Sequence, residues 1–289
     1  MDLIASPSKT KEILSKYPFV FRKKYGQNFL IDSHVLNKII KGAQITEEDC
    51  VLEIGPGIGS LTQVLSFQAK KVIAVEIDDQ LIPILNDTLG QYDNIKIIHG
   101  DILKIDLKKL IEEENSNQPI KVVANLPYYI TTPIIMELLE SKLPVKSITI
   151  MVQKEVAQRL AASPGSKDYG AISVAVQYYS KPCLLANVPH NCFIPRPNVD
   201  SAVIHLEVFN EPTVSVKDEA LFFKIIKAAF SQRRKTLINS LYNQNVISIS
   251  KEEMASILSR VGLDENIRGE MLSIDEFAKL SDALSEYLK

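Results

Sequence analysis

The stretch "VLEIGPGIGSLT", residues 51–62, decides the fold of this chain. An apolar run of strand character leads directly into a loop with glycines at Gly55, Gly57 and Gly59, and a helical pattern follows. Glycine lets the backbone approach a ligand closely, because no side chain stands in the way. A strand, a glycine-rich loop and a helix in this order are typical of a cofactor-binding loop, although a tight strand-to-helix turn would give the same pattern.

Short apolar runs alternate with segments of helical period between residues 50 and 153. The strand candidates are "CVLEI", "KVIAVEI", "NIKIIHG", "IKVVANL" and "SITIMVQ". This alternation predicts a mostly parallel sheet covered by helices on both faces, and "DSAVIHLEVF", residues 200–209, finishes it as an antiparallel edge strand. We therefore expect an α/β, Rossmann-like fold whose ligand site lies at the carboxyl ends of the strands.

The C-terminal part of the chain has a different pattern. From Asp218 onwards, amphipathic helices follow one another without intervening strands. We predict a catalytic domain at residues 1–209, with a basic N-terminal segment at 1–30, and a small all-helical domain at 210–289. The residues before "FRKKYGQNFL" are expected to be the least firmly placed, ordering only over bound substrate.

The glycine-rich loop favours S-adenosylmethionine over NAD. Ser60 stands where a dinucleotide-binding loop has its third glycine, and S-adenosylmethionine has no pyrophosphate to be held there. Glu76 ends the second strand 21 residues after Gly55, where a carboxylate can accept from both ribose hydroxyls. Asp101 ends the third strand, where it can accept from an adenine amino group. Each acid alone is more often a strand-end or N-cap residue, but the three strand ends together indicate an adenosine-containing ligand.

The motif "NLPYY" ends the fourth strand, beside that ligand. An exocyclic amine of a nucleobase is a poor nucleophile, because its lone pair is delocalised into the ring. The side-chain carbonyl of Asn125 and a backbone carbonyl held by Pro127 can accept its two N–H bonds and aim the lone pair at a methyl group. Tyr128 can stack on the base. A Pro-terminated strand with a packing tyrosine would give the same four residues.

Charge is distributed unevenly along a chain whose net charge is only −2. Residues 1–41 hold eight Lys/Arg against three Asp/Glu, and residues 224–235 hold five Lys/Arg and no acid. Such segments can produce a basic face on a mildly acidic protein, although each is also explained as a solvated surface. The candidates for RNA contact are Arg22, Lys23, Lys24, Arg233, Arg234 and Lys235.

The remaining composition excludes several protein classes. Cys50, Cys183 and Cys192 lack CxxC spacing and the four histidines are scattered, so we predict neither a disulfide framework nor a metal site. No apolar run approaches the roughly 18 residues of a membrane span. We expect a cytoplasmic protein without membrane contact, and a monomer.

Several motifs together resemble the ribosomal RNA adenine dimethyltransferase family. They are "GQNFL", "EIGPGIGSLT", "VEID", "GDIL", "NLPYYITTP", "FIPRPNVDSAV" and "FSQRRKTL", in this order along almost the whole chain. The resemblance is closest to the KsgA branch, which modifies small-subunit rRNA. It implies a class I S-adenosylmethionine-dependent methyltransferase that places four methyl groups on two adjacent adenosines in a hairpin near the 3′ end of 16S rRNA, with a role in subunit biogenesis and a C-terminal domain that binds rRNA.

The resemblance also implies roles for individual residues. The cofactor-binding residues that it implies, together with their strand-end neighbours, are Asn28, Leu30, Gly55, Gly57, Glu76, Ile77, Asp101, Ile102 and Asn125. At the target adenine it places Asn125, Leu126, Pro127, Tyr128 and Phe193. Phe193 would form the second wall of a base sandwich, although a loop-end phenylalanine of this kind is otherwise more often a core residue.

Two alternatives stay open at this point. An Erm-type methylase of 23S rRNA shares the cofactor and Asn-Leu-Pro motifs, and "FIPRPNVDSAV" with the long helical tail argues against it. A non-catalytic RNA- or DNA-binding relative would use the same fold, but every motif residue that the chemistry requires is present.

Overall fold

The computed structural model describes residues 3–244, 246–247 and 249–287. The chain divides into two compact units. Unit 1 comprises Met1–Ala157 and Lys181–Val208, and unit 2 comprises Gln158–Ser180 and Phe209–Lys289. The predicted helical domain at 210–289 differs from this division in one respect, since unit 2 also contains residues 158–180.

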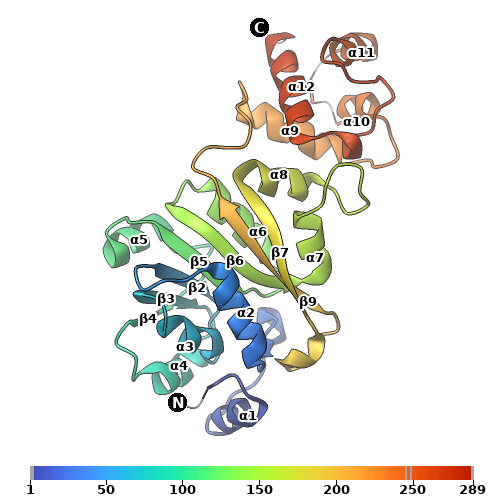
Figure 1. Ribbon diagram of the computed structural model, residues 1–289. Coiled ribbons are helices and arrows are strands. Elements are labelled where there is room, and N and C mark those ends of the chain that lie inside the picture. The colour runs from blue at the N-terminus through green and yellow to red at the C-terminus, as the bar shows by residue number, and fades with distance from the viewer. Residues whose placement is uncertain (1–2, 245, 248, 288–289) are drawn as a thin grey trace. The chain divides into compact units, whose positions relative to one another are not determined.

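A seven-stranded mixed sheet forms the centre of unit 1, with the strand order β4-β3-β2-β5-β6-β9-β7 (Figure 1). The strands are β2 (Cys50–Ile54), β3 (Lys71–Glu76), β4 (Ile95–His99), β5 (Ile120–Asn125), β6 (Val145–Gln153), β7 (Ser180–Val188) and β9 (Ser201–Val208). β2 to β6 are parallel, as the βαβ pattern predicts, and β9 is antiparallel to β6. β9 is therefore the predicted antiparallel strand, but β7 lies beyond it at the edge.

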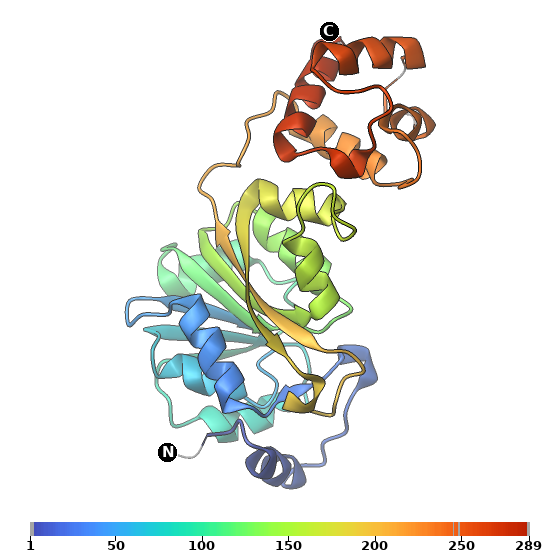
Figure 2. The ribbon, with the colours of Figure 1, turned by 45° about the vertical axis from the view of Figure 1, so that its right-hand side comes forward.

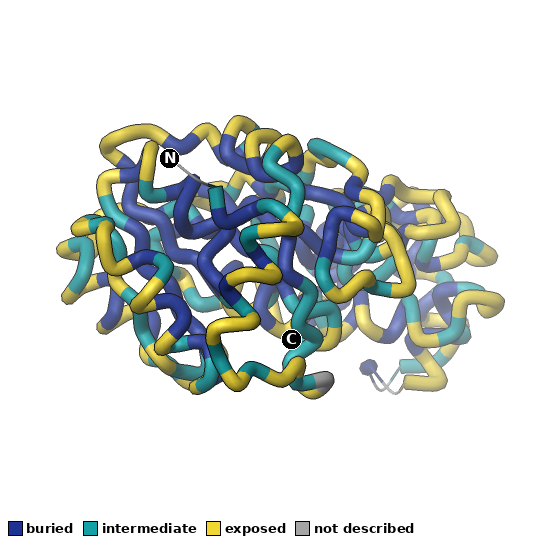
Figure 3. Tube along the Cα trace, turned by 90° about the horizontal axis from the view of Figure 1, so that it is seen from below, coloured by how far each residue is buried: buried dark blue, intermediate teal, exposed yellow. Residues whose placement is uncertain are grey.

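The register of the central strands brings the sequence motifs together. Ile54 of β2 pairs with Val75 on one side and with Ala124 on the other. The next residue along each strand is Gly55, Glu76 or Asn125, so these three residues stand side by side at the carboxyl edge of the sheet. All five residues of β2 are buried, and Figure 3 shows such buried stretches running through the interior of the trace.

Helices pack on the sheet of unit 1 and supply its core. They are α1 (Pro7–Ser15), α2 (Ser33–Ala43), α3 (Ser60–Ser66), α4 (Leu81–Leu89), α5 (Leu107–Asn115) and α6 (Thr131–Glu140), and α7 (Lys154–Leu160) follows β6. Apolar residues of α2 and α3, such as Leu36 and Leu65, share one core with Val51 of β2 and Val123 of β5. Figure 2 shows α2 lying along one face of the sheet. A short second sheet pairs β1 (Phe29–Leu30) with β8 (Phe193–Ile194).

The N-terminal segment is packed, contrary to the prediction that the residues before Phe21 are the least firmly placed. Ser6 caps α1 by accepting from the Lys9 N–H, and Pro7 stands at the first helical position, where its missing N–H costs nothing. Ile4 and Ile13 are buried in a cluster with the apolar residues of α4. The apolar residues of α1 are too few to give a clear periodic pattern, which is why the helix was not predicted.

Unit 2 is helical and has its own core. Its helices are α8 (Ala171–Tyr179), α9 (Glu219–Ala229), α10 (Leu237–Asn243), α11 (Lys251–Arg260) and α12 (Ile274–Tyr287). Tyr169, Phe222 and Phe277 are wholly buried in one cluster. The Tyr169 hydroxyl donates to the Leu272 carbonyl at 2.9 Å, which ties residues 158–180 to the C-terminal helices. This long-range packing explains why the local pattern after residue 154 assigns the segment to the catalytic domain.

Candidate functional site

A cavity of about 760 Å³, including its part open to solvent, lies in unit 1 at the carboxyl ends of β2, β3 and β5. Such a volume suits a ligand of nucleoside-cofactor size. Four segments of the chain line the cavity. They are residues 25–30, residues 53–61 of the glycine-rich loop, residues 76–81 after β3 and residues 125–128 after β5.

The glycine-rich loop leaves room in this cavity. Gly55 and Gly57 have φ angles of +69° and +62°, a conformation that favours glycine. A Cβ atom on Gly57 would stand 3.0 Å from the Phe29 ring, so a side chain there would need the ring to move. A Cβ atom on Gly55 would meet nothing within 4 Å. The backbone at Gly55 therefore faces open space that a ligand can use.

Two buried carboxyl groups line the cavity. Glu76 is 4% exposed, and its oxygens accept from the Gly57 N–H at 3.1 Å and the Asp78 N–H at 2.8 Å. Burial raises the pKa of Glu76 to about 7 despite these two hydrogen bonds. Burial likewise raises the pKa of Glu53 to about 8. A nearby positive charge would favour the ionised form of both groups.

Unpartnered polar atoms also face this region. Glu53 Oε2 and Ser60 Oγ are buried and have no hydrogen-bond partner among the described residues, and both residues line the cavity. Buried polar atoms are rarely left without partners, so a ligand that brings N–H or O–H donors fits here. S-adenosylmethionine brings an ammonium group, two ribose hydroxyls and a sulfonium charge. The residues present thus fit this cofactor.

The motif after β5 has a fixed geometry. Asn125 Nδ2 donates to the Asn28 carbonyl at 3.0 Å, which leaves the side-chain oxygen as the acceptor end of the amide. The Pro127 carbonyl already accepts from Thr131 Oγ1 at 3.1 Å and from the Ile130 N–H at 3.3 Å. Among the described residues no hydrogen bond reaches the Leu126 carbonyl. The two acceptors available at this turn are therefore Asn125 Oδ1 and the Leu126 carbonyl.

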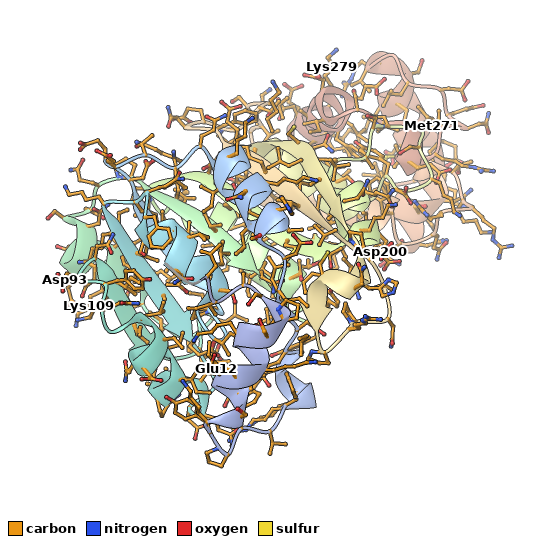
Figure 4. The ribbon with its side chains drawn as sticks, turned by 60° about the horizontal axis from the view of Figure 1, so that its bottom comes forward. Glu12, Asp93, Lys109, Asp200, Met271 and Lys279 are labelled. Atoms are coloured by element: carbon orange, nitrogen blue, oxygen red, sulfur yellow. The ribbon has the colours of Figure 1, made fainter. Side chains whose placement is uncertain are left out.

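Tyr128 is held at the edge of the same cavity. Its hydroxyl lies 2.7 Å from Ser201 Oγ at the start of β9, and burial raises the pKa of Tyr128. The residue before Ser201 is Asp200, which is labelled in Figure 4 and accepts from the His190 N–H at 2.9 Å. Hydrogen bonds thus fix both Tyr128 and the loop that leads into β9.

Most predicted cofactor and catalytic residues line the cavity. They are Asn28, Leu30, Gly55, Gly57, Glu76, Ile77, Asn125, Leu126, Pro127 and Tyr128. Asp101, Ile102 and Phe193 are not among the lining residues. The last register pair of β3 and β4 joins Glu76 to His99, so Asp101 stands two residues past the sheet, where it accepts from the Leu103 N–H at 3.1 Å. Phe193 is 1% exposed and belongs to the core shared by α2 and β5.

The sequence did not indicate several lining residues. Tyr25, Gly26 and Gln27 line the cavity from the N-terminal segment, and only the resemblance marked their neighbours Asn28 and Leu30. Glu53 also lines it, but an acid within an apolar strand gave no separate signal. The strand position of Glu53, two residues before Gly55, is the feature from which its place at the cavity follows.

The first predicted basic cluster is only partly free. Arg22 Nη1 lies 2.7 Å from Asp78 Oδ1 and 2.6 Å from Asp79 Oδ1. Lys24 Nζ lies 4.5 Å from the centre of the Tyr25 ring, a cation–π contact on an exposed side chain. The side chain of Lys23 lies outside the described part of the structure. Arg22 is therefore engaged with the protein, whereas Lys24 has no ion pair among the described residues.

The second cluster, in unit 2, shows the same division. Arg233 Nη2 donates to the carbonyls of Lys167 and Tyr169, each at 2.7 Å. Arg234 and Lys235 are exposed, and neither forms an ion pair within the described ranges. The arginine closest to the rest of the unit thus holds the segment 158–180, and its two neighbours carry the charge available to a partner.

Two further findings concern metals and membranes. No group of three or more His, Cys, Asp or Glu side chains that could hold a metal gathers among the described residues. None of the described helices has the length and apolar character to cross a membrane.

The sheet, the glycine-rich loop and the cavity define a class I, Rossmann-like methyltransferase fold whose cofactor is S-adenosylmethionine. The model of the family "Ribosomal RNA adenine dimethylase" matches residues 19–286, and the chain belongs to this family. The family assignment that the motifs indicated is thereby confirmed.

Three relatives illustrate the match. A protein of Lachnoclostridium phytofermentans named ribosomal RNA small subunit methyltransferase A is 57% identical over 290 residues, and the match covers 100% of both chains. A dimethyladenosine transferase from Plasmodium falciparum superposes with a TM-score of 0.75 at 27% identity, over 90% of this chain and 97% of that one. The 23S rRNA methyltransferase ErmE superposes with a TM-score of 0.68 at 24% identity, over 89% of this chain and 100% of that one. At this identity the likeness to ErmE shows the fold alone.

Proposed function

We propose that this protein is the cytoplasmic, monomeric enzyme that dimethylates N6 of two adjacent adenosines in a hairpin near the 3′ end of 16S rRNA. Its substrate is the small ribosomal subunit or the precursor of that subunit, and the modification contributes to subunit biogenesis. The full-length 57% identity to a protein named for the small subunit supports this choice of rRNA. The observation that carries the chemistry is the Asn125 amide, whose nitrogen is tied to the Asn28 carbonyl so that its oxygen remains to accept.

The cavity residues would hold the cofactor by complementary charge and hydrogen bonds. Glu76 would accept from the ribose hydroxyls, since each carboxylate oxygen has a lone pair beyond the backbone N–H bond that it already accepts. Glu53 and Ser60 supply buried acceptors for the ammonium group. Gly55 leaves space that any side chain would fill. When bound, S-adenosylmethionine supplies an activated methyl group on its sulfonium.

Asn125 and Leu126 would prepare the target amine. The two N–H bonds of an adenine N6 group can donate to Asn125 Oδ1 and to the Leu126 carbonyl, the two acceptors left free at this turn. Two such bonds favour a pyramidal nitrogen and direct its lone pair away from the acceptors. No strong base is needed before attack, because the methyl donor is already activated and the proton can leave afterwards. Catalysis would rest on positioning and preorganised acceptors.

Tyr128 would supply the stacking face for the adenine. It lines the cavity next to Leu126 and Pro127, and its ring position is fixed by the Ser201 hydrogen bond. Phe193 stays a prediction as the second wall, because its ring would have to turn out of the core to reach a base. Asp101 and Ile102 stay predictions for the adenine of the cofactor, since they lie beyond the cavity lining.

The RNA would be attracted by cations that the protein does not use for itself. Lys24, Arg234 and Lys235 are exposed and have no ion pair among the described residues. Phosphate contacts of this kind supply affinity without sequence specificity.

The experiment that tests this function is methylation of isolated ribosomal subunits from cells that lack the modification. The protein and S-adenosylmethionine are incubated separately with small and large subunits, and the rRNA nucleosides are identified by mass spectrometry. We expect N6,N6-dimethyladenosine in the small subunit only. Product in the large subunit would make this chain a 23S rRNA methylase, and no product in either would indicate a binding protein.

A further inference from the structure

Residues 19–28, which we term the strap, run from α1 to β1 and form one wall of the cavity. Tyr25, Gly26, Gln27 and Asn28 all line the cavity. Gly26 has a φ angle of +56°, and a Cβ atom there would stand 3.5 Å from the Tyr129 ring. The strap therefore passes close to the motif that ends β5.

Two strap side chains hold the strap to the loop after β3. Arg22 Nη1 lies 2.7 Å from Asp78 Oδ1, and Gln27 Nε2 donates to Asp78 Oδ2 at 2.5 Å. Gln27 Oε1 in turn accepts from the Arg22 N–H at 2.8 Å. Asp78 is 0% exposed, so its charge depends on these partners rather than on water. Asp79, which also contacts Arg22, is exposed and adds less.

The end of the strap reaches the catalytic amide. The Asn28 carbonyl accepts from Asn125 Nδ2 at 3.0 Å, and Asn28 Nδ2 donates to the Gly26 carbonyl at 2.9 Å. A primary amide can turn over and exchange its oxygen and nitrogen. The Asn28 carbonyl accepts only from the nitrogen end, and it would repel the oxygen end. A turned amide would present N–H groups to the target amine, which needs an acceptor.

We propose that Arg22 is a positioning residue for methyl transfer: its ion pair with Asp78 holds the strap, and the strap places the Asn28 carbonyl that keeps the Asn125 oxygen facing the target amine. This inference rests on the proposed function of Asn125. It gives Arg22 a role in the rate of transfer, in place of the RNA contact that the sequence suggests. A phosphate could bind Arg22 only by separating it from two carboxylates.

The test compares Arg22→Gln with Arg22→Lys and with Lys11→Gln. Arg22 contacts both carboxylates through a single nitrogen, so an ammonium group can replace it, and Arg22→Lys should restore most of the lost rate. Lys11→Gln removes the same charge from the exposed side of α1 and serves as the matched control. If Arg22→Gln does not fold, Asp78→Asn removes the same ion pair without leaving an unpaired buried carboxylate.

Single-turnover methylation of small subunits, at saturating cofactor and saturating subunit, is the first measurement. We expect Arg22→Gln to be at least about tenfold slower, as for a misaligned catalytic group, with subunit affinity unchanged within twofold. Lys11→Gln should react at the parental rate. A parental single-turnover rate for Arg22→Gln, combined with weaker subunit binding, would make Arg22 an RNA contact and overturn the proposal.

Hydrogen–deuterium exchange of residues 19–28, together with exchange of the Asn125 side-chain amide followed by NMR, is the second measurement and needs no activity. Both should exchange faster in Arg22→Gln than in the parent and Lys11→Gln. Unchanged exchange would show that the ion pair does not hold the strap. If the parent protein methylates no subunit, the proposed function fails, whereas the exchange data still decide whether Arg22 holds the strap and the Asn125 amide.

Discussion

The cavity of unit 1 and the basic segment 233–235 of unit 2 hold their functional side chains in opposite ways. Glu76 and Asn125 are tied to the main chain by hydrogen bonds between 2.8 and 3.1 Å. Arg234 and Lys235 are exposed and unpaired among the described residues, and only Arg233 is fixed. The difference follows from the task, because methyl transfer needs fixed geometry, whereas attraction of phosphates acts through charge at a distance. Substitutions in the cavity should therefore affect rate and cofactor affinity steeply, and those in the basic segment should act mildly and depend on salt.

The largest effect is expected for Asn125→Ala. Loss of one preorganised acceptor should lower the single-turnover rate on small subunits by on the order of 10²–10³-fold at saturating cofactor. Asn115→Ala is the matched control, because it removes an amide that donates to the Gln118 carbonyl away from the cavity, and it should leave the rate unchanged. A rate for Asn125→Ala within a few-fold of the parent would mean that "NLPYY" is only a strand terminus.

Glu76→Ala comes next. Removal of a charged acceptor for the ribose hydroxyls should weaken S-adenosylmethionine binding by roughly 10- to 100-fold. Small-subunit affinity should barely change, because Glu76 is buried away from the surface that RNA meets. Calorimetric titration measures the cofactor affinity, and an unaltered value would remove Glu76 from the cofactor site.

The third prediction concerns pH. Burial raises the pKa of Glu76 from 4.5 to about 7 and that of Glu53 to about 8 in the free protein. The folded state therefore binds more protons than the unfolded state between pH 4.5 and about 8, so this contribution to the free energy of unfolding decreases as pH rises through that range. A cofactor with net positive charge favours the ionised carboxylates, so its affinity should increase by up to roughly tenfold from pH 6 to pH 8.

Titration calorimetry at pH 6, 7 and 8, in buffers of different ionisation enthalpy, measures both the affinity and the protons released on binding. Glu76→Gln should flatten the dependence, because its side chain cannot ionise. An affinity that is equal at pH 6 and pH 8 in the parent protein would show that the two carboxyl groups are already ionised before the cofactor binds.

The smallest effect is expected in the basic segment. Replacing Arg234 and Lys235 together with Ala should weaken small-subunit binding several-fold and reduce the salt dependence by about one unit of slope per lost phosphate contact. Arg233→Ala should instead lower the stability of unit 2 by about 1–2 kcal/mol, since two backbone carbonyls lose a charged donor. Equal salt slopes for the double variant and the parent would reduce the segment to a solvated surface. A greater loss of binding than of stability in Arg233→Ala would erase the distinction between the three cations.

The parts of the fold that sequence predicted are those set by local periodicity. β2 to β6 are continuous apolar runs, and parallel pairing places their ends together, so the place of Gly55, Glu76 and Asn125 follows from the pattern alone. β7 was not predicted, because its run is interrupted by Pro182 and shows no strict alternation. The place of residues 158–180 depends on contacts such as Tyr169 with Leu272, which no local pattern contains.

The candidate site shows the same boundary. A strand end can be counted from the sequence, but the two residues that separate His99 from Asp101 move that carboxylate past the cavity lining. The burial of Phe193 follows from the pairing of β1 with β8, which joins residues more than 160 positions apart. The number of positive charges in a segment is visible in the sequence, whereas the carboxylates that engage Arg22 and the carbonyls that engage Arg233 are visible only in the structure.

The most direct test of the central claim is to map the methylated nucleosides within 16S rRNA. Small subunits from cells that lack the modification are reacted to completion, and the rRNA is cut into defined fragments for mass spectrometry. The account predicts four added methyl groups, as N6,N6-dimethyladenosine at two adjacent adenosines of a hairpin near the 3′ end, and none with Asn125→Ala over the same time. Methyl groups on another base, at N6 of isolated adenosines, or in equal yield with Asn125→Ala would contradict it.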